Sequence, residues 1–252
     1  MVDASIAALY RYPVKGLRAE QLQQVMLEAD QTIPFDRAYA IENGPGSFDD
    51  TAPRHLPKVA FLCLMRDERL ATLETTFDAE TSVLTLARDG DLLARGALRT
   101  GKGRCAIEDF IARDLAAELR GVPRVVSATG HSFSDVKEKC LHIINLSSVR
   151  ALEKATGRAV DAMRFRANVI IDGLEAWGEL DWVGREIGLG GATLRVFKRT
   201  VRCAATNVDP QTGVRADDLP GAIFDARGHR DFGVYANVVC GGLIRIGDRC
   251  EG

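Results

Sequence analysis

Residues 198–213 read KRTVRCAATNVDPQTG. A strand-like run of alternating residues, 192–200, ends inside this stretch, and a turn signal follows it. Proline fixes φ at about −65° and glycine readily supplies a positive φ, so residues 209–213 are predicted to reverse the chain. The stretch therefore places one cysteine, Cys203, between the end of a strand and a tight turn.

Three cationic side chains occupy the five positions before this cysteine: Lys198, Arg199 and Arg202. Nearby positive charge favours the thiolate, which is the form that attacks electrophiles or binds metal. Free cysteines are also among the most buried residue types. The residues alone therefore leave two interpretations of Cys203 open, an ordinary buried thiol and a reactive or metal-binding one.

The first hundred residues are typical of a small antiparallel sheet or barrel. Short strands separated by turn signals are predicted over residues 5–12, 21–27, 37–41, 70–77, 83–88 and 92–97. Residues 59–65 are too short and uniform to assign, and strand or short helix are both allowed. The polar, glycine-rich residues 99–103 suggest a boundary, so two domains are expected, 1–98 and 99–252.

The second part of the chain is predicted to contain more strands than helices. A helix follows the boundary, because Ile107, Phe110, Ile111, Leu115 and Leu119 recur at spacings of three and four. Ser147 is expected to cap a second helix that ends at Gly157. The predicted strands are 141–145, 164–171, 186–189, 192–198, 234–239 and 243–246, with an irregular, charged segment at 216–231. The fold class expected is mainly β with a few helices.

Bulk composition excludes several classes of protein. The chain has 33 basic and 35 acidic residues, a balance that lacks the electrostatic footprint of a nucleic-acid binder. The N-terminus has no signal-peptide pattern, and the longest apolar run is far too short to span a bilayer. We therefore expect a cytoplasmic protein without nucleic-acid or membrane partners. The six cysteines form no C-x-x-C pair, which argues against a zinc ribbon or a thioredoxin-type redox pair.

The stretch around Cys203 resembles the core motif of the MOSC family, named for the C-terminal domain of molybdenum cofactor sulfurase. The family pattern, approximately R-C-x-x-T-x-V-D-P-x-T-G, is matched at every fixed position between Arg202 and Gly213. Segments 12–16, 36–39, 164–168 and 232–237 also fall in family order. The resemblance covers nearly the whole chain and extends to the branch that includes the mitochondrial amidoxime-reducing component. It implies a β-barrel-like MOSC domain preceded by a smaller antiparallel β-barrel domain.

The resemblance also implies a cofactor, the molybdenum–pterin group Mo-molybdopterin, and a set of residues to hold it. Cys203 would be the metal ligand and the catalytic residue, because a thiolate extends the sulfur donor set of the cofactor. Guanidinium and ammonium groups suit the pterin phosphate. The residues implied are Lys15, Arg37, Arg166 and Arg202 for the phosphate, Arg164 as an extra contact on the same strand face, and Asn168 for the pterin edge. Two alternatives stay open: Arg202 acts only on the ionisation of the thiol, and Asn168 is an amide of a turn or of the core edge. Tyr235 is expected to pack, and neither His131 nor His142 is assigned to the site.

The sequence leaves three functions open. In the first, the protein is an oxidoreductase that reduces N-hydroxylated bases or related N- or S-oxides. The chain has no C-x₄-C-x₂-C cluster, so electrons would come from a separate ferredoxin- or flavin-type donor protein. In the second, it is a non-catalytic carrier of the cofactor or of sulfur on Cys203. In the third, Cys203 is a plain nucleophile, which requires a general base within hydrogen-bond reach.

Overall fold

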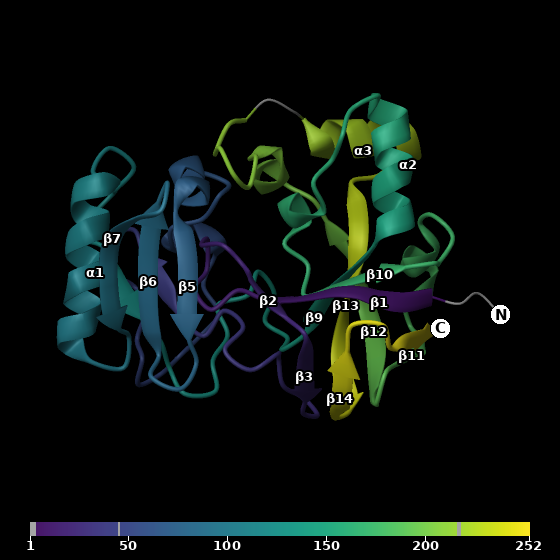
Figure 1. Ribbon diagram of the computed structural model, residues 1–252, viewed down its shortest axis with the longest axis horizontal. Helices are drawn as coiled ribbons and strands as arrows, with labels where there is room; N and C mark the ends of the chain where they lie inside the picture. Colours follow the sequence, from purple (N-terminus) through teal and green to yellow (C-terminus); the bar gives the residue numbers. More distant parts are fainter. Residues whose placement is uncertain (1–3, 45, 216–217) are drawn as a thin grey trace.

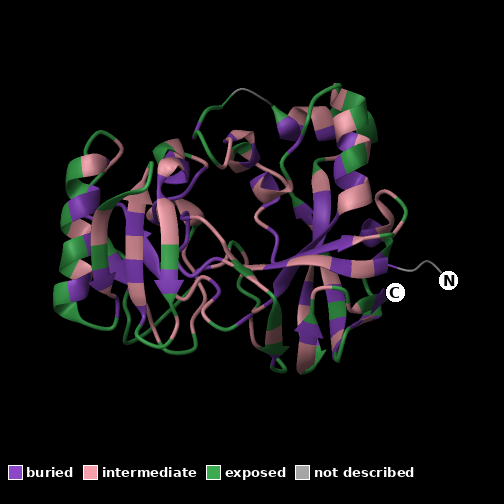
Figure 2. Cartoon of the chain, viewed as in Figure 1, coloured by how far each residue is buried: buried purple, intermediate pink, exposed green. Residues whose placement is uncertain are grey.

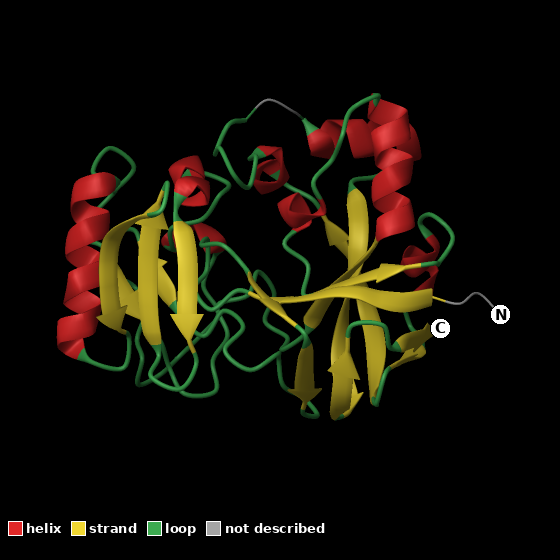
Figure 3. Cartoon of the chain, viewed as in Figure 1, coloured by secondary structure: helices red, strands yellow, loops and turns green. Residues whose placement is uncertain are grey.

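A computed structural model describes residues 4–44, 46–215 and 218–252. The chain forms two lobes that lie side by side, which we call the N-terminal lobe and the barrel lobe (Figure 1). Strands dominate both lobes, with three α-helices among the described residues, so the predicted mainly β fold class is confirmed (Figure 3). None of the helices formed by these residues has the length and apolar character needed to cross a bilayer.

Seven strands of the barrel lobe close on themselves. In spatial order they are β10 (Val169–Asp172), β9 (Leu141–Asn145), β13 (Asp231–Cys240), β12 (Ala192–Val201), β11 (Glu186–Leu189), β15 (Arg249–Glu251) and β1 (Ala4–Arg11), which pairs back to β10. Every pairing is antiparallel except β9 with β10. The short strand β2 (Glu20–Leu22) extends the sheet beyond β1, and β3 (Gln24–Leu27) pairs with β14 (Gly242–Arg245) as a separate ribbon.

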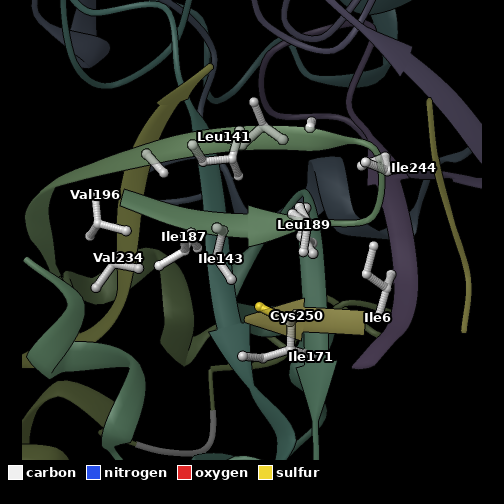
Figure 4. Close-up of a cluster of buried hydrophobic side chains, with 14 of the residues drawn as sticks. Ile6, Leu141, Ile143, Ile171, Ile187, Leu189, Val196, Val234, Ile244 and Cys250 are labelled. Carbon is white, nitrogen blue, oxygen red and sulfur yellow. The ribbon is translucent and has the colours of Figure 1, made fainter. Parts of the chain in front are cut away.

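The interior of the barrel is apolar. Strand side chains alternate between the two faces of a sheet, and the inward set includes Ile6, Leu141, Ile143, Ile171, Ile187, Leu189, Val196 and Val234, all buried (Figure 4). Helices α2 (Leu146–Thr156) and α3 (Leu219–Arg227) lie next to each other outside the barrel (Figure 1). Their buried residues join a second cluster with Ile144 and Ile170, on the outer face of β9 and β10.

The N-terminal lobe is an antiparallel β structure covered by one helix. It contains a three-stranded sheet of β5 (Glu74–Asp78), β6 (Val83–Arg88) and β7 (Asp91–Ala97), and a pair formed by β4 (Ala40–Glu42) and β8 (Arg124–Val126). Helix α1 (Gly101–Asp114) packs on this lobe, and its buried face shares a core with β5 and β6 (Figure 2).

The glycine-rich residues 99–103, which suggested a domain boundary, form the start of α1. Thr100 caps the helix by accepting a hydrogen bond from the Gly103 backbone N–H, and Gly103 lies so close to Ala97 that a Cβ would clash with its backbone. We propose that the division between the lobes falls after β8, not at residue 98. Strand β1 belongs to the barrel, so the barrel lobe is built from segments before and after the N-terminal lobe.

Several element predictions are corrected. The strand predicted at 164–171 begins only at Val169, because Ala162–Phe165 form a 3₁₀ turn and Arg166 has a φ of 53°. The segment predicted to be irregular contains α3, which Asp218 caps, although residues 216–217 lie outside the described residues. Helix α2 is capped by Asn145 and not by Ser147. The predicted strand 83–88 and the hairpin of β11 and β12 are confirmed.

Candidate functional site

A cavity of about 270 Å³ lies where the two lobes meet, and ten of the 25 residues that line it are charged. The lining cations are Lys15, Arg37, Lys58, Arg164, Arg166, Lys198, Arg199 and Arg202, and the lining carboxylates are Asp36 and Asp135. The chain as a whole carries a net charge of −2, so the excess of positive charge is local to this cavity. Such a concentration of one sign attracts ligands of the opposite sign.

Cys203 lies on the cavity wall immediately after β12. It precedes a short 3₁₀ turn, Ala204–Asn207, and its carbonyl oxygen accepts hydrogen bonds from the N–H and the hydroxyl of Thr206 at 3.0 and 2.9 Å. Its Sγ accepts a hydrogen bond from Nζ of Lys58 at 3.1 Å. The thiol therefore faces a cation that the N-terminal lobe supplies.

The residues after Cys203 shape the loop that holds it. The Asp209 carboxylate accepts hydrogen bonds from the backbone N–H groups of Gln211 and Thr212, and Gly213 has a φ of 73°. The predicted chain reversal at 209–213 is thus confirmed. Val208 is buried in the core of the N-terminal lobe, which anchors the loop on the opposite lobe.

Arg164 supports this same loop. Its guanidinium donates to the carbonyl oxygen of Asn207 at 3.1 Å and pairs with the Asp209 carboxylate at 3.3 Å. The expectation that Arg164 shares a strand face with Arg166 is wrong, because neither residue lies in a strand. Both nevertheless line the cavity.

Arg37 and Arg166 flank one aromatic ring. Their guanidinium carbons lie 4.6 and 4.3 Å from the ring centroid of buried Tyr12. Both arginines have left-handed backbone conformations, with φ of 51° and 53°, which non-glycine residues adopt rarely and at some cost. One Arg37 nitrogen donates to the carbonyl oxygen of Arg166 at 3.1 Å, and Arg166 in turn donates to the carbonyl oxygen of Leu17 at 2.9 Å. Strained backbone of this kind clusters at functional sites.

Both arginines remain charged at neutral pH. Burial lowers the pKa of Arg166 to about 10, which still leaves it protonated. Burial also acts to lower the pKa of Arg37, but the adjacent Asp36 carboxylate outweighs it and holds that pKa above its ordinary value. The same carboxylate accepts hydrogen bonds from the Tyr12 backbone N–H at 2.8 Å and from the Asn168 amide at 2.9 Å.

Four charged or polarisable groups follow one another across the cavity: Lys15, Asp135, Lys58 and Cys203. Lys15 is only 6% exposed, and its Nζ donates to the carbonyl oxygen of Phe133 and to Asp135. Lys58 lies 3.8 Å from the other carboxylate oxygen of Asp135. Burial tends to raise the pKa of Asp135, but the ammonium groups of Lys15 and Lys58 hold it well below its ordinary range. Asp135 is therefore ionised, and one positive charge among these three side chains is left over.

Asn168 and Arg202 also line the cavity, and they differ in how fully they are hydrogen-bonded. Besides its bond to Asp36, the Asn168 amide accepts a hydrogen bond from the His142 backbone N–H at 3.1 Å, so it fixes the protein's own structure. Arg202 donates to the carbonyl oxygen of Phe165 at 2.8 Å, but its buried Nε has no hydrogen-bond partner within the described part of the chain. A buried N–H group without a hydrogen-bond partner lowers the stability of the fold, so this Nε is a candidate donor to a bound ligand.

The structure therefore gathers all seven residues that the sequence assigned to the site, and adds others. Lys58 and Asp135 were missed because Lys58 lies in a short 3₁₀ turn and Asp135 in a loop, and neither segment shows a periodicity or a motif. Asp36 was missed although it lies in a segment, 36–39, that matches the family. His142 also lines the cavity, 3.4 Å from Arg202, and burial lowers its pKa well below the ordinary value, so it is neutral.

The donor chemistry of the cavity fits an anionic cofactor that brings its own metal ligands. Within the ranges that the structure describes, no group of three or more His, Cys, Asp or Glu side chains could hold a metal ion by itself. Besides buried Cys63 and Cys140, the cavity offers the Cys203 thiol beside Lys58, several cations and the Nε of Arg202, for which no described residue is a partner. A thiolate suits a thiophilic metal, and the cations suit a phosphate.

Comparisons with known proteins identify the family of both parts of the chain. The family model of the MOSC N-terminal beta barrel domain matches residues 3–108, and that of the MOSC domain matches residues 128–251. Molybdenum cofactor sulfurase of Drosophila willistoni is 26% identical over 244 residues, covering 89% of this chain and 30% of that protein. Human mitochondrial amidoxime-reducing component 1 is 28% identical over 118 residues, covering 42% of this chain and 34% of that protein.

The chain spans about a third of the length of these curated relatives. Among solved structures, the YuaD protein of Bacillus subtilis aligns with a TM-score of 0.46 and 13% identity, covering 98% of this chain and 94% of that one.

Proposed function

The chain belongs to the MOSC family, and from that membership and the cavity we propose that it is a molybdenum-cofactor-dependent oxidoreductase. Its substrates are small N-hydroxylated compounds or N- or S-oxides, and its electrons come from a separate ferredoxin- or flavin-type protein. The observation that carries this proposal is the position of Cys203, whose Sγ accepts a hydrogen bond from the Lys58 ammonium on the wall of a cation-lined cavity. The name of one relative, amidoxime-reducing component, supports the substrate class.

Cys203 would bind the metal, and Lys15, Arg37 and Arg166 would bind the phosphate of the cofactor. Arg202 adds a buried N–H donor that no described residue satisfies. We assign Arg164 and Asn168 chiefly to positioning, because Arg164 holds the Cys203 loop and Asn168 holds Asp36. Their direct contact with the cofactor, which the family resemblance implies, stays a prediction.

The cofactor, when bound, supplies two-electron and oxygen-transfer chemistry. For an N-hydroxylated substrate the N–O bond breaks, two electrons come from the donor protein, and two protons convert the products to an N–H compound and water. The protein's own residues hold the substrate beside Cys203 and keep the surroundings positively charged, which stabilises negative charge that develops on the departing oxygen.

The test is turnover of benzamidoxime to benzamidine by the molybdenum-loaded protein with a chemical reductant. We expect turnover by the wild type and at least a hundredfold less by Cys203→Ala. Bound molybdenum without turnover of any N-hydroxylated compound, N-oxide or S-oxide would contradict the enzyme and favour the carrier. Activity that survives removal of molybdenum but is lost on alkylation of Cys203 with iodoacetamide would favour the plain nucleophile.

A further inference from the structure

Lys58 extends from the N-terminal lobe to the proposed metal ligand. Its Nζ lies 3.1 Å from Sγ of Cys203 and 3.8 Å from the carboxylate of Asp135. An ammonium group has three N–H donors and no acceptor. Within the described residues only the sulfur accepts a hydrogen bond from this one, which leaves two N–H groups for a ligand.

The backbone of Lys58 is firmly placed. Lys58 begins a 3₁₀ turn, Lys58–Ala60, whose first carbonyl oxygen accepts from the N–H of Phe61. The carbonyl oxygen of Ala60 accepts from the N–H of Asn43, which ties the turn to the end of β4. A lysine side chain loses considerable rotamer freedom when it is held in one position. The two contacts of Nζ, with Cys203 and Asp135, hold this side chain across the gap between the lobes.

We propose that Lys58 binds the oxygen atom of the substrate that is to be removed, and that it favours oxygens that carry negative charge and no proton. This inference rests on the proposed function. A group bound beside Sγ of Cys203 lies within reach of Nζ, and a hydrogen bond from an ammonium to a charged oxygen is stronger than one to a neutral hydroxyl. An N-oxide or S-oxide oxygen accepts hydrogen bonds only, which matches a group that donates only.

Lys15, the other lysine beside Asp135, is less suited to bind the substrate oxygen. Lys15 is buried, and its Nζ is already hydrogen-bonded to Phe133 and Asp135. Asp135 is held between two ammonium groups, so its charge is largely offset there. Lys58 is partly exposed to the cavity and keeps free donors. For an N-oxide, two electrons from the donor protein and two protons break the N–O bond and release the oxygen as water.

The experiment compares wild type, Lys58→Met, Lys58→Arg and the control Lys154→Met, an exposed lysine on α2 that does not line the cavity. Each is loaded with cofactor and tested on pyridine N-oxide and on benzamidoxime, with molybdenum content measured in parallel. Losing one charge-assisted hydrogen bond corresponds to about a 10- to 100-fold effect. We expect kcat/KM of Lys58→Met to fall by that factor for pyridine N-oxide and several-fold less for benzamidoxime, with Lys58→Arg restoring most of the loss.

Molybdenum content and the folding of all four proteins should be equal. Loss of molybdenum from Lys58→Met would overturn the inference, because Lys58 would then act on the metal site. Equal losses for the two substrates, or none, would overturn it too and leave the reductase standing. Binding of pyridine N-oxide, measured by ligand-observed NMR, separates the two proposals. If no protein turns over either substrate but Lys58→Met alone binds the N-oxide more weakly, the reductase fails and Lys58 keeps its role. If binding is also unchanged, both fail.

Discussion

The interior of the barrel and the cavity between the lobes are built on opposite principles. The barrel interior is filled by apolar side chains on regular strands, such as Leu141 and Val196, and the alternation of those strands dictates which residues point inward. Most of the cations that line the cavity lie outside regular strands, and two of them, Arg37 and Arg166, have left-handed backbone conformations. Burial of apolar side chains in the barrel stabilises the folded protein. Holding like charges close together in the cavity destabilises it.

Because of this difference, we expect mutations in the barrel interior and mutations in the cavity to have distinct effects. Changes inside the barrel should lower stability without altering the chemistry of the cavity. Changes in the cavity should weaken ligand binding with little loss of stability. A protein in which the two kinds of effect cannot be separated would contradict this view of the fold.

The largest effect on stability is expected for Leu141→Ala. Leu141 is fully buried in β9, and truncation of a buried leucine costs about 2–5 kcal/mol because apolar contacts are lost and a cavity remains. The matched control is Leu92→Ala on β7, where the side chain is 65% exposed and the expected change is below about 0.5 kcal/mol. Urea unfolding followed by circular dichroism measures both. A cost below 1 kcal/mol for Leu141→Ala would show that this core is loosely packed.

A buried carboxyl group in the barrel lobe should make stability depend on pH. Glu179 is fully buried, and burial raises its pKa to about 7, although the hydroxyl of Ser148 donates a hydrogen bond to it. The folded state therefore binds a proton at pH values where the unfolded chain, with an ordinary pKa of 4.5, has released it. The contribution of Glu179 to the free energy of unfolding therefore falls as pH rises from about 4.5 through 7.

Glu179→Gln mimics the neutral carboxyl and removes this dependence. Relative to wild type, the variant should gain about 2 kcal/mol between pH 5 and pH 8, as expected for a pKa shift of this size. Glu186→Gln, an exposed residue of β11 paired with Arg195, is the control and should follow the wild type. Denaturant unfolding across this pH range measures the difference. Parallel curves for Glu179→Gln and wild type would mean that Glu179 is ionised in the fold.

In the cavity, two substitutions of Arg166 separate the effect of its charge from the effect of its backbone conformation. Glutamine and glycine at this position both remove the guanidinium, but only glycine relieves the positive φ. We expect both variants to retain the cofactor about tenfold more weakly, since each loses a charge-assisted contact with phosphate. Arg166→Gly should be about 1 kcal/mol more stable than Arg166→Gln. Molybdenum remaining after dialysis and thermal unfolding measure the two effects. Undiminished retention in both variants would remove Arg166 from the phosphate site.

Sequence periodicity located regular strands in both lobes, but it did not locate the residues of the site. Strands such as β6 and β9 could be located because their residues show the hydrophobic patterns that are typical of regular strands. Residues 164–168 match the family but have no strand pattern, and the prediction of a strand there failed because Arg166 takes a conformation that no periodicity reveals. Residues 99–103 suggested a domain boundary, but Gly101 and Gly103 belong to α1, and Gly103 packs closely against β7.

Family resemblance, not periodicity, located the candidate site. It identified Cys203, Lys15 and Arg37 from fixed positions in motifs, and the structure brings these distant segments to one cavity. Lys58 and Asp135 could not be found in this way, because their importance depends on which loops face each other across two lobes. That information lies in tertiary packing and in no local stretch of the chain.

The most direct test of the central claim, that Cys203 binds the metal of a molybdenum cofactor, is the molybdenum content of three proteins. Wild type, Cys203→Ser and Cys105→Ser would be purified from a host that makes the cofactor and analysed by mass spectrometry. Cys105 lies exposed on α1 and serves as the matched control. We predict near-stoichiometric molybdenum in wild type and Cys105→Ser, and at least tenfold less in Cys203→Ser. Equal molybdenum in all three, or none in any, would contradict the account.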